Sequence, residues 1–310
     1  MALNLNSLLE DGTLAPDLSQ EIFSRVYEQS AAARLAKPAQ MSIKGNTFLI
    51  DSGRVEADIV EEGQAKPVSN PTLGFVKATP IKAAVITTWT KEFRLANPAR
   101  ALDLLRDKLV EAINEQVDAA VFYGRKVKSK SDIDGVRFIN ETANRVTLGT
   151  APVNEGGIAR DIMAGYDLVL GSDKAQDFTA FAADPRFRST TANAVDANGR
   201  PISTIDLTNG GLNSQTGSLY GLPVAYSRSV SGRYGIGNPD TGVRAFGGDY
   251  GNALRLGFVE DISVKMTDVA TVDGVSLWQT NQEAILAEAI FSYVVDPEAF
   301  VAYETTPAGS

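Results

Sequence analysis

The chain reads Glu61-Glu62-Gly63-Gln64-Ala65-Lys66-Pro67-Val68-Ser69-Asn70-Pro71 between two β-rich segments, 48–60 and 73–88. A two-stranded hairpin alone is only marginally stable in water. Unstructured connections beyond about 12 residues are also uncommon in compact domains unless they serve binding. We therefore predict a hairpin arm that needs a neighbouring chain for its stability.

The composition is ordinary for a globular protein. The chain has 310 residues, of which 44% are hydrophobic and 22% are charged, so it has ample material for a core. Its length predicts one irregular domain or two entwined ones. No apolar run is long enough to span a bilayer, and Met1–Asn6 lacks the features of a signal peptide. We expect a soluble, unexported chain with no membrane partner.

Two missing residue types narrow the possible chemistry. The chain has no cysteine and no histidine, which excludes disulfides, thiolate nucleophiles, histidine-based triads and the most frequent transition-metal ligand. An enzyme of this composition would need carboxylates, lysine or tyrosine. The net charge of −9 argues against a broad surface for gripping nucleic acid. A wall that encloses DNA without adhering to it would also be acidic.

One helix is predicted more clearly than the others. It begins at Asn97-Pro98, because Asn is a good N-cap and Pro fits the first helical position, and Gly124 ends it. Apolar residues recur every three or four positions over 98–123, and the opposite face is charged. Its length suits a structural spine. Shorter helices are expected at 17–35, 158–170 and 173–181.

The later part of the chain favours strands. Glycine is concentrated between 196 and 251 around short β stretches such as 222–227, which predicts an irregular β-rich module. Strands are expected at 253–259 and 262–266. The run 284–295 is ambiguous on propensity alone, because its first half favours a helix and its second half a strand.

Motifs that carry chemistry are weak or absent. Gly235–Gly242 begins like a dinucleotide fingerprint, but a proline stands where a helix should open, and Asp132–Gly135 has the wrong spacing for a calcium loop. Glu61-Glu62 is a poor acid–base pair, because neighbours on a strand point to opposite faces. Trp89 and Trp278 are interpreted as core or interface anchors. We expect no catalytic residue, no cofactor and no metal site.

The densest basic run lies just after the long helix, at Arg125, Lys126, Lys128 and Lys130. One interpretation is a solvated loop, which is the usual behaviour of a charge run. The alternative is a loop that meets an acidic patch on another subunit, such as Glu61-Glu62, and tunes register more than affinity.

Several blocks, taken in order along the chain, carry a family resemblance. They are 61–67 with 71–75, then 117–124, 220–224 and 293–301. They are similar, in turn, to the extended loop, the end of the spine helix, a strand of the axial domain and the C-terminal strand of one family. Together they resemble the major capsid proteins of tailed bacteriophages with the Hong Kong 97-like fold.

The resemblance implies an α+β fold and one long strand over 284–295. It implies an N-terminal arm at 1–16, peripheral-domain segments at 17–48, 86–149 (spine helix 98–123) and 261–310, an extended β-hairpin loop at 49–85 and an inserted axial domain at 150–260. It also implies that the extended loop lies across the adjacent subunit. The expected inter-subunit contacts are Arg54, Glu56, Asp58, Glu61, Glu62, Lys66 and Phe75 on the loop, and Arg125, Lys126, Lys128 and Lys130 on the basic run.

In function, the resemblance implies a structural protein that forms hexamers and pentamers of an icosahedral shell around double-stranded DNA, bound without sequence specificity. The expected location is the virion capsid, assembled in the bacterial cytoplasm. Few residues precede the first predicted helix, so we expect a separate scaffolding protein, together with a portal; a decoration protein is left open. Lys66, Lys77 and Lys82 are available for a covalent crosslink, but no local motif fixes its partner.

Two alternatives stand beside this interpretation. An encapsulin-type compartment shares the same fold but encloses enzymes rather than DNA. A monomeric carboxylate-dependent enzyme with a β-rich domain is the alternative from another class, and it requires a pair of facing carboxylates that the sequence does not locate.

Overall fold

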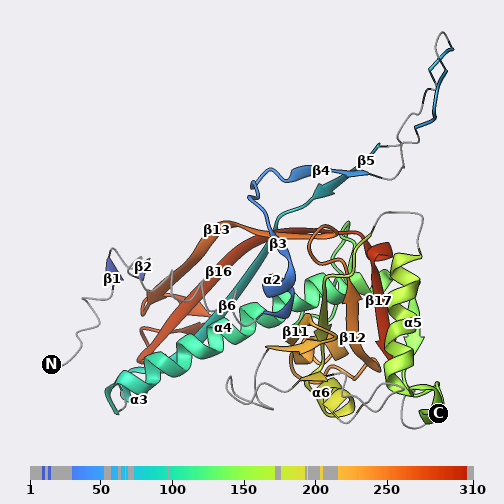
Figure 1. Cartoon of the computed structure of the whole chain (residues 1–310). Coiled ribbons are helices and arrows are strands. Elements are labelled where there is room, and N and C mark those ends of the chain that lie inside the picture. Colours follow the sequence, from blue (N-terminus) through green and yellow to red (C-terminus); the bar gives the residue numbers. More distant parts are fainter. Residues whose placement is uncertain are drawn as a thin grey trace.

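The computed structural model describes residues 9–10, 13–14, 30–51, 57–61, 64–66, 68, 73–96, 98–171, 176–192, 194, 203–204 and 216–305. Figure 1 shows a body of two sheets and a long helix, from which a thin arm projects. The first part of the helix predicted at 17–35 lies outside the described residues. Its end is present as α2 (Ala31–Leu35), which begins at the N-cap Ser30.

The larger sheet contains the strands β1 (Leu9–Glu10), β2 (Thr13–Leu14), β3 (Lys37–Pro38), β6 (Ile81–Thr90), β13 (Leu254–Thr267) and β16 (Gln282–Val295). Its order is β1-β2-β13-β16-β6, and β3 pairs with β13 beside this path. β16 pairs antiparallel with β13 on one side and with β6 on the other. It is therefore an interior strand of the sheet, paired on both sides.

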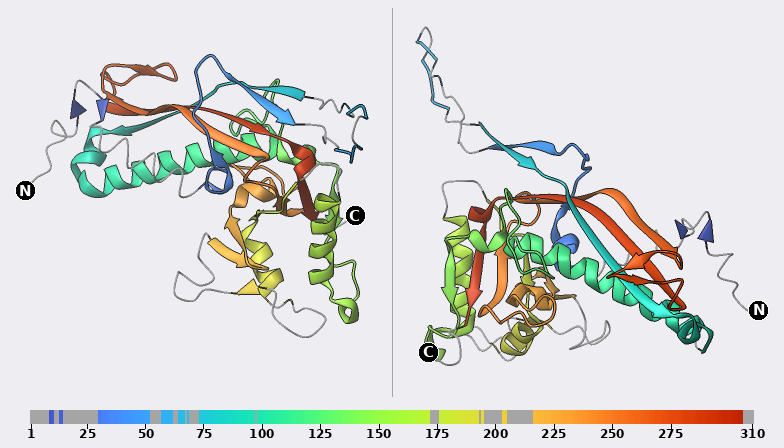
Figure 2. Two further views of the ribbon diagram at one scale, coloured as in Figure 1. Left: turned by 45° about the horizontal axis from the view of Figure 1, so that its top comes forward. Right: turned by 180° about the vertical axis from the view of Figure 1, so that it is seen from behind.

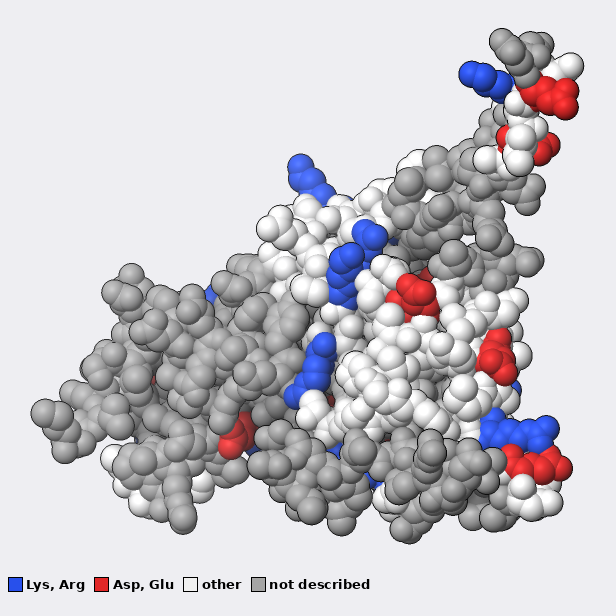
Figure 3. All heavy atoms as spheres, viewed as in Figure 1, with Lys and Arg blue, Asp and Glu red and all other residues white. Residues whose placement is uncertain are grey.

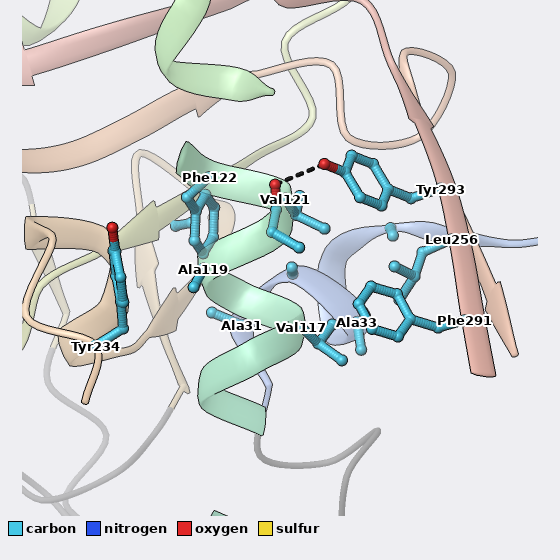
Figure 4. Packing of buried hydrophobic residues seen from close by; sticks show 14 of the residues in the cluster. Ala31, Ala33, Val117, Ala119, Val121, Phe122, Tyr234, Leu256, Phe291 and Tyr293 are labelled. Carbon is cyan, nitrogen blue, oxygen red and sulfur yellow. Dashed lines mark hydrogen bonds between the residues drawn. The ribbon is translucent and has the colours of Figure 1, made fainter. Parts of the chain in front are cut away.

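The predicted spine helix is confirmed as α4 (Pro98–Tyr123), which lies along the larger sheet (Figure 1). Its buried face includes Val117 and Phe122, which have no exposed surface, and Phe122 stacks on Phe246 with ring centroids 5.6 Å apart. Figure 4 shows Val117 and Phe122 among their neighbours. Tyr293 donates a hydrogen bond of 2.6 Å to the carbonyl of Ala120 there. One helical face thus carries the main core.

Two predictions about the larger sheet need revision. The strands expected at 253–259 and 262–266 form the single strand β13, which passes two register shifts against β16 between Phe258 and Ser263. The run 284–295 is one continuous strand inside β16, which confirms the long strand implied by the family resemblance and not the helix that propensity favours for its first half. Pairing along both edges outweighs that propensity.

The smaller sheet contains β7 (Arg145–Thr147), β8 (Ala180–Ala183), β9 (Ser203–Thr204), β10 (Thr216–Leu219), β11 (Leu222–Tyr226), β12 (Val243–Gly248) and β17 (Phe300–Glu304). Its order is β7-β17-β12-β8-β11-β10-β9. Helix α5 (Ile158–Leu170), which confirms the second predicted helix, packs on β17 through a hydrogen bond from Tyr303 Oη to the carbonyl of Ile162 (2.9 Å). Within the described part of the predicted β-rich module at 196–251, the strands are β9 to β12 of this sheet, whereas β7, β8 and β17 come from outside the module.

The helix predicted at 173–181 is wrong. Where the structure describes this segment, 176–179 is irregular and 180–183 is the buried strand β8, which lies between β11 and β12. A helix begins only at Pro185, as α6 (Pro185–Ala192). Because small and aromatic residues at 180–183 fit between two strands, sheet pairing replaces the local helical preference.

Short elements complete the described chain. These are α3 (Lys91–Ala96), the hairpin pairs β4 (Asn46–Asp51) with β5 (Leu73–Ala78) and β14 (Thr271–Val272) with β15 (Val275–Ser276), and the 3₁₀ turns η2 (Ile139–Glu141), η3 (Val153–Glu155), η5 (Arg228–Ser231) and η6 (Pro297–Ala299). η6 joins β16 of the larger sheet directly to β17 of the smaller one.

A buried carboxylate ties three segments together at the join between the sheets. Asp118 of α4 accepts hydrogen bonds from Ser30 Oγ (2.7 Å), from the backbone N–H of Ala32 (3.1 Å) and from Ser227 Oγ (2.8 Å). Burial raises the pKa of Asp118, although these hydrogen bonds oppose the rise. The spine helix is thereby joined to the start of α2 and to the end of β11.

Candidate assembly surfaces

The arm is a two-stranded sheet of its own, formed by β4 and β5. Its strands pair in antiparallel register, with Thr47 opposite Lys77 and Phe48 opposite Val76. Phe48, Val76 and Ala78 face a small core against the body, whereas Phe75 is 72% exposed. Because side chains alternate along a strand, the arm has one packed face and one open face.

The foot of the arm is held in place by hydrogen bonds of Asn46 and by a cation–π contact with the body. The side chain of Asn46 accepts a hydrogen bond from the N–H of Ser42 (2.8 Å) and donates one to the carbonyl of Gln40 (3.0 Å). Gly45 has φ 83°, a conformation that favours glycine. The guanidinium of Arg255 lies 5.3 Å from the centre of the Phe48 ring. The direction of the arm is therefore set by the body.

The far end of the arm is acidic and exposed. Asp58, Glu61 and Lys66 are exposed, and Figure 3 shows the charged side chains at this end standing clear of the body. The backbone hydrogen bonds described there are local, from Ile59 to the Asp58 side chain and from Gln64 to the Glu61 carbonyl. The predicted contact residues Arg54, Glu56 and Glu62 lie outside the described residues.

The basic run forms a short hairpin after α4. Arg125 is paired with Asp132 (Nε to Oδ1, 3.1 Å), and Lys130 donates to the carbonyl of Gly237 (3.1 Å). Lys126 and Lys128 are exposed. Two of the four predicted cations are therefore engaged within the chain, which leaves the exposed pair as the part of the loop open to another subunit.

The two tryptophans differ in environment. Trp89 is 8% exposed and donates to Glu283 Oε2 (3.1 Å), so it is a core anchor. Trp278 is 73% exposed, and its segment is linked to α3 by hydrogen bonds between Asn281 and residues Lys91 and Glu92. Leu95 on α3 and Val269 are also largely exposed. The exposure of Leu95 and Val269 was not predicted. The one signal in the sequence for this region is Trp278, a tryptophan in a polar stretch.

A charge network braces the smaller sheet. The carboxylate of Asp184 is paired with Arg186 (3.0 Å) and Arg233 (2.8 Å), and Asp240 is paired with Arg186 (2.6 Å) and Arg244 (2.9 Å). Burial acts to raise the pKa of Asp240, but the hydrogen bonds from Arg244, Gly242 and Arg186 outweigh it and lower the pKa to about 2.

Within the described ranges, no group of three or more acidic residues could hold a metal ion. The helices of this part of the chain are also too short or too polar to cross a bilayer. The described surface has an open arm face, an acidic arm end, two exposed loop lysines (Lys126 and Lys128) and exposed apolar side chains at Leu95, Val269 and Trp278. These features fit contacts between chains better than chemistry on a small molecule.

Comparisons with known proteins agree on one family. The model of the phage capsid family matches residues 11–305. The probable major capsid protein gp17 of Mycobacterium phage D29 is 26% identical over 309 residues, covering 96% of this chain and 92% of that protein. Its counterpart in Mycobacterium phage L5 is 27% identical over 306 residues, covering 94% and 89%.

Solved structures give the same result for the fold. A chain from Gordonia phage Cozz is similar with a TM-score of 0.71 and 31% identity, covering 90% of this chain and 87% of that one. The capsid of an empty GTA particle is similar with a TM-score of 0.57 at 14% identity, covering 89% and 90%. Together with the family match over nearly the whole length, these findings show that the chain belongs to the phage capsid family.

Proposed function

We propose that this chain is the major capsid protein of a tailed bacteriophage and that it assembles, as hexamers and pentamers, into an icosahedral shell around double-stranded DNA. The observation that carries the proposal is the β4–β5 arm, which has an open apolar and basic face and an exposed acidic end. The body covers one face of this arm at its foot, and another chain that covers the open face would add to its stability.

The division of the chain follows from the same proposal. The extended loop spans 49–85 and the axial domain spans 150–260, while 17–48, 86–149 and 261–310 form the peripheral domain and 1–16 an N-terminal arm. Helix α4 with β16 supports the peripheral assignment, and α5 with β8 to β12 supports the axial one. The strands β7 and β17 of the smaller sheet come from outside 150–260, and β13 of the larger sheet crosses the bound at 260. This is the Hong Kong 97-like arrangement that the sequence resembles.

The proposed contacts between subunits are of two kinds. On the arm they are Asp58, Glu61, Lys66 and Phe75, together with the predicted residues Arg54, Glu56 and Glu62. On the basic loop, Lys126 and Lys128 contribute most, because Arg125 and Lys130 already have partners within the chain. The net charge of −9 supports a wall that encloses DNA without gripping it.

The test is electron microscopy and light scattering of the purified chain, alone and with a separate scaffolding protein from the same phage. We expect capsomer rings or closed hollow particles, and nuclease-resistant DNA in particles that are filled in the host in the presence of the portal. A monodisperse species with the mass of one chain under both conditions would overturn the proposal. Particles that contain a protein cargo and no DNA would contradict the DNA-enclosing role.

A further inference from the structure

The open face of the arm near its foot is basic and apolar. Phe75 and Lys77 share this face, because the alternate residues Val76 and Ala78 face the body. Ile43 is 64% exposed in the adjoining turn, where Lys44 is also exposed. A methyl group on Gly45 would lie 3.3 Å from Lys77 Cε, so this turn and Lys77 are neighbours. We call Ile43, Lys44, Phe75 and Lys77 the root face.

The charges of the root face are uncompensated within the described chain. The ion pairs between described residues involve neither Lys44 nor Lys77, whereas Lys82, the next lysine along, is paired with Glu288 at 2.7 Å. Phe75 is 72% exposed beside them. The root face therefore has two cations with no ion-pair partner among the described residues, next to two large exposed apolar side chains.

The far end of the arm has the opposite charge on a similar apolar background. Asp58, Ile59, Val60 and Glu61 follow one another, and Ile59 is 97% exposed. We call these four residues the tip strip. At the far end of the arm, Figure 3 shows acidic side chains with a basic one beside them. The tip strip offers two acids around two apolar residues, which complements the root face.

We infer that the tip strip of one subunit binds the root face of the next copy of this chain. The two surfaces lie at opposite ends of the arm in Figures 1 and 2, so a tip strip meets a root face only on another molecule. A contact between two different surfaces of the same protein is heterologous, and it closes into a ring when the rotation allows. The inference rests on the proposed function and names the receiving surface within a capsomer.

Two other occupants fit the root face less well. A DNA backbone needs cations but gains little from Phe75 and Ile43, which lie among the lysines. The basic loop offers Lys126 and Lys128 to an acidic tip, and one large exposed apolar side chain, Ile236 (99% exposed), lies beside it, because Lys130 donates to the carbonyl of the next residue, Gly237. The root face combines two cations with two large exposed apolar side chains, Ile43 and Phe75, to meet Ile59 and Val60 of the tip strip, and this larger apolar surface favours the root face over the basic loop.

Charge reversal tests the pairing. The variants are Asp58→Lys with Glu61→Lys (tip reversed), Lys44→Glu with Lys77→Glu (root reversed) and all four together. Each reversed pair should lower the yield of closed particles at least tenfold, and the fourfold variant should recover most of the loss. Lys265→Glu, at an exposed lysine on β13, is the matched control and should assemble normally. Thermal unfolding of unassembled subunits verifies that each variant folds.

A covalent probe provides a second, independent test, because the chain has no cysteine. Ile59→Cys combined with Phe75→Cys should form disulfides between copies on mild oxidation of assembled particles, giving a ladder up to the capsomer on a non-reducing gel. Ile59→Cys combined with Val269→Cys pairs the same tip with a residue that is 73% exposed elsewhere, and it should give no ladder.

Each contrary outcome has a distinct meaning. Recovery of the tip-reversed variant by Lys126→Glu with Lys128→Glu, but not by root reversal, would overturn the inference in favour of the basic loop. Normal assembly of the root-reversed variant with reduced DNA retention would overturn it in favour of a polyanion. If the wild type forms particles, but the fourfold variant does not recover assembly and Ile59→Cys with Phe75→Cys gives no ladder, then the pairing is wrong while the proposed function stands. Failure of the wild type to assemble with scaffold would sink the proposed function as well.

Discussion

Gly257 shows how a single residue decides whether the segment before the arm, residues 37–39, can pack on β13 of the larger sheet. We call this segment the strap. Gly257 lies on β13 opposite Ser292. A Cβ at this position would stand 1.8 Å from the carbonyl oxygen of Ala39, which is a backbone atom and cannot rotate away. Only glycine allows the two backbones to approach this closely.

Gly257→Ala should therefore lower the free energy of unfolding of the isolated subunit by about 3 kcal/mol, because the strap must shift away from β13. Gly251→Ala is the matched control: its Cβ would meet its nearest neighbour at 3.5 Å, so the change should stay within about 0.5 kcal/mol. Urea denaturation of both variants measures the difference. Equal effects would refute the role of the close approach.

Asp240 gives a prediction for pH. Its pKa is lowered to about 2 in the folded chain, from 3.8 for an ordinary aspartate, because the hydrogen bonds that it accepts outweigh its burial. Its stabilising contribution is present above pH 3.8 and is lost as the pH falls through about 2. Asp240→Asn should cost about 1.5 kcal/mol at neutral pH.

The difference in unfolding free energy between wild type and Asp240→Asn should shrink over that acidic window. Chemical denaturation of subunits at several pH values measures it. A difference that stays constant between pH 4 and pH 2 would show that the carboxylate charge is not what Arg186 and Arg244 stabilise.

At the scale of elements, α4 illustrates which predictions local sequence can support. Asn97-Pro98, the apolar period and Gly124 are local signals in the sequence, and the bounds that they predict match those of α4 (Pro98–Tyr123). β16 and β8 differ, because their strand character depends on partners far away in the chain. On propensity alone, residues 284–295 are divided between a helix and a strand. The helix predicted at 173–181 overlaps the strand β8.

The two faces of α4 should respond differently to truncation. Phe122→Ala removes a ring with no exposed surface that stacks on Phe246, so it should lower the free energy of unfolding by about 4 kcal/mol. Glu111→Ala on the exposed face breaks only its pair with Lys108 and should cost about 0.5 kcal/mol or less. Thermal or urea unfolding compares the two variants. A large effect of Glu111→Ala would mean that this face is also packed.

At the scale of the whole molecule, folding and assembly are separable. The described hydrogen bonds of the arm end are local, whereas its foot packs on Met41 and Val294. The body therefore owes little of its stability to the arm end. The shell, in our proposal, depends on it.

Deletion of Asp58–Asn70 should leave a folded subunit whose melting temperature stays within a few degrees of the wild type, but one that no longer forms closed shells. Calorimetry measures the first property and electron microscopy the second. Replacing the same residues with a glycine–serine linker of equal length controls for chain length and should also fail to assemble. Particles of normal size from either variant would contradict the assembly role of this segment.

By itself, the sequence determined three things about this protein: the bounds of the spine helix, a hairpin arm before β6, and the exclusion of histidine and cysteine chemistry. These depend on residue identity and on contacts within a few positions. Only the tertiary structure decided that β16 pairs with β13 on one side and β6 on the other, that Arg125 and Lys130 are engaged within the chain, and that Phe75 and Lys77 share an open face. Those properties arise from pairing and burial between distant segments, which local propensity does not encode.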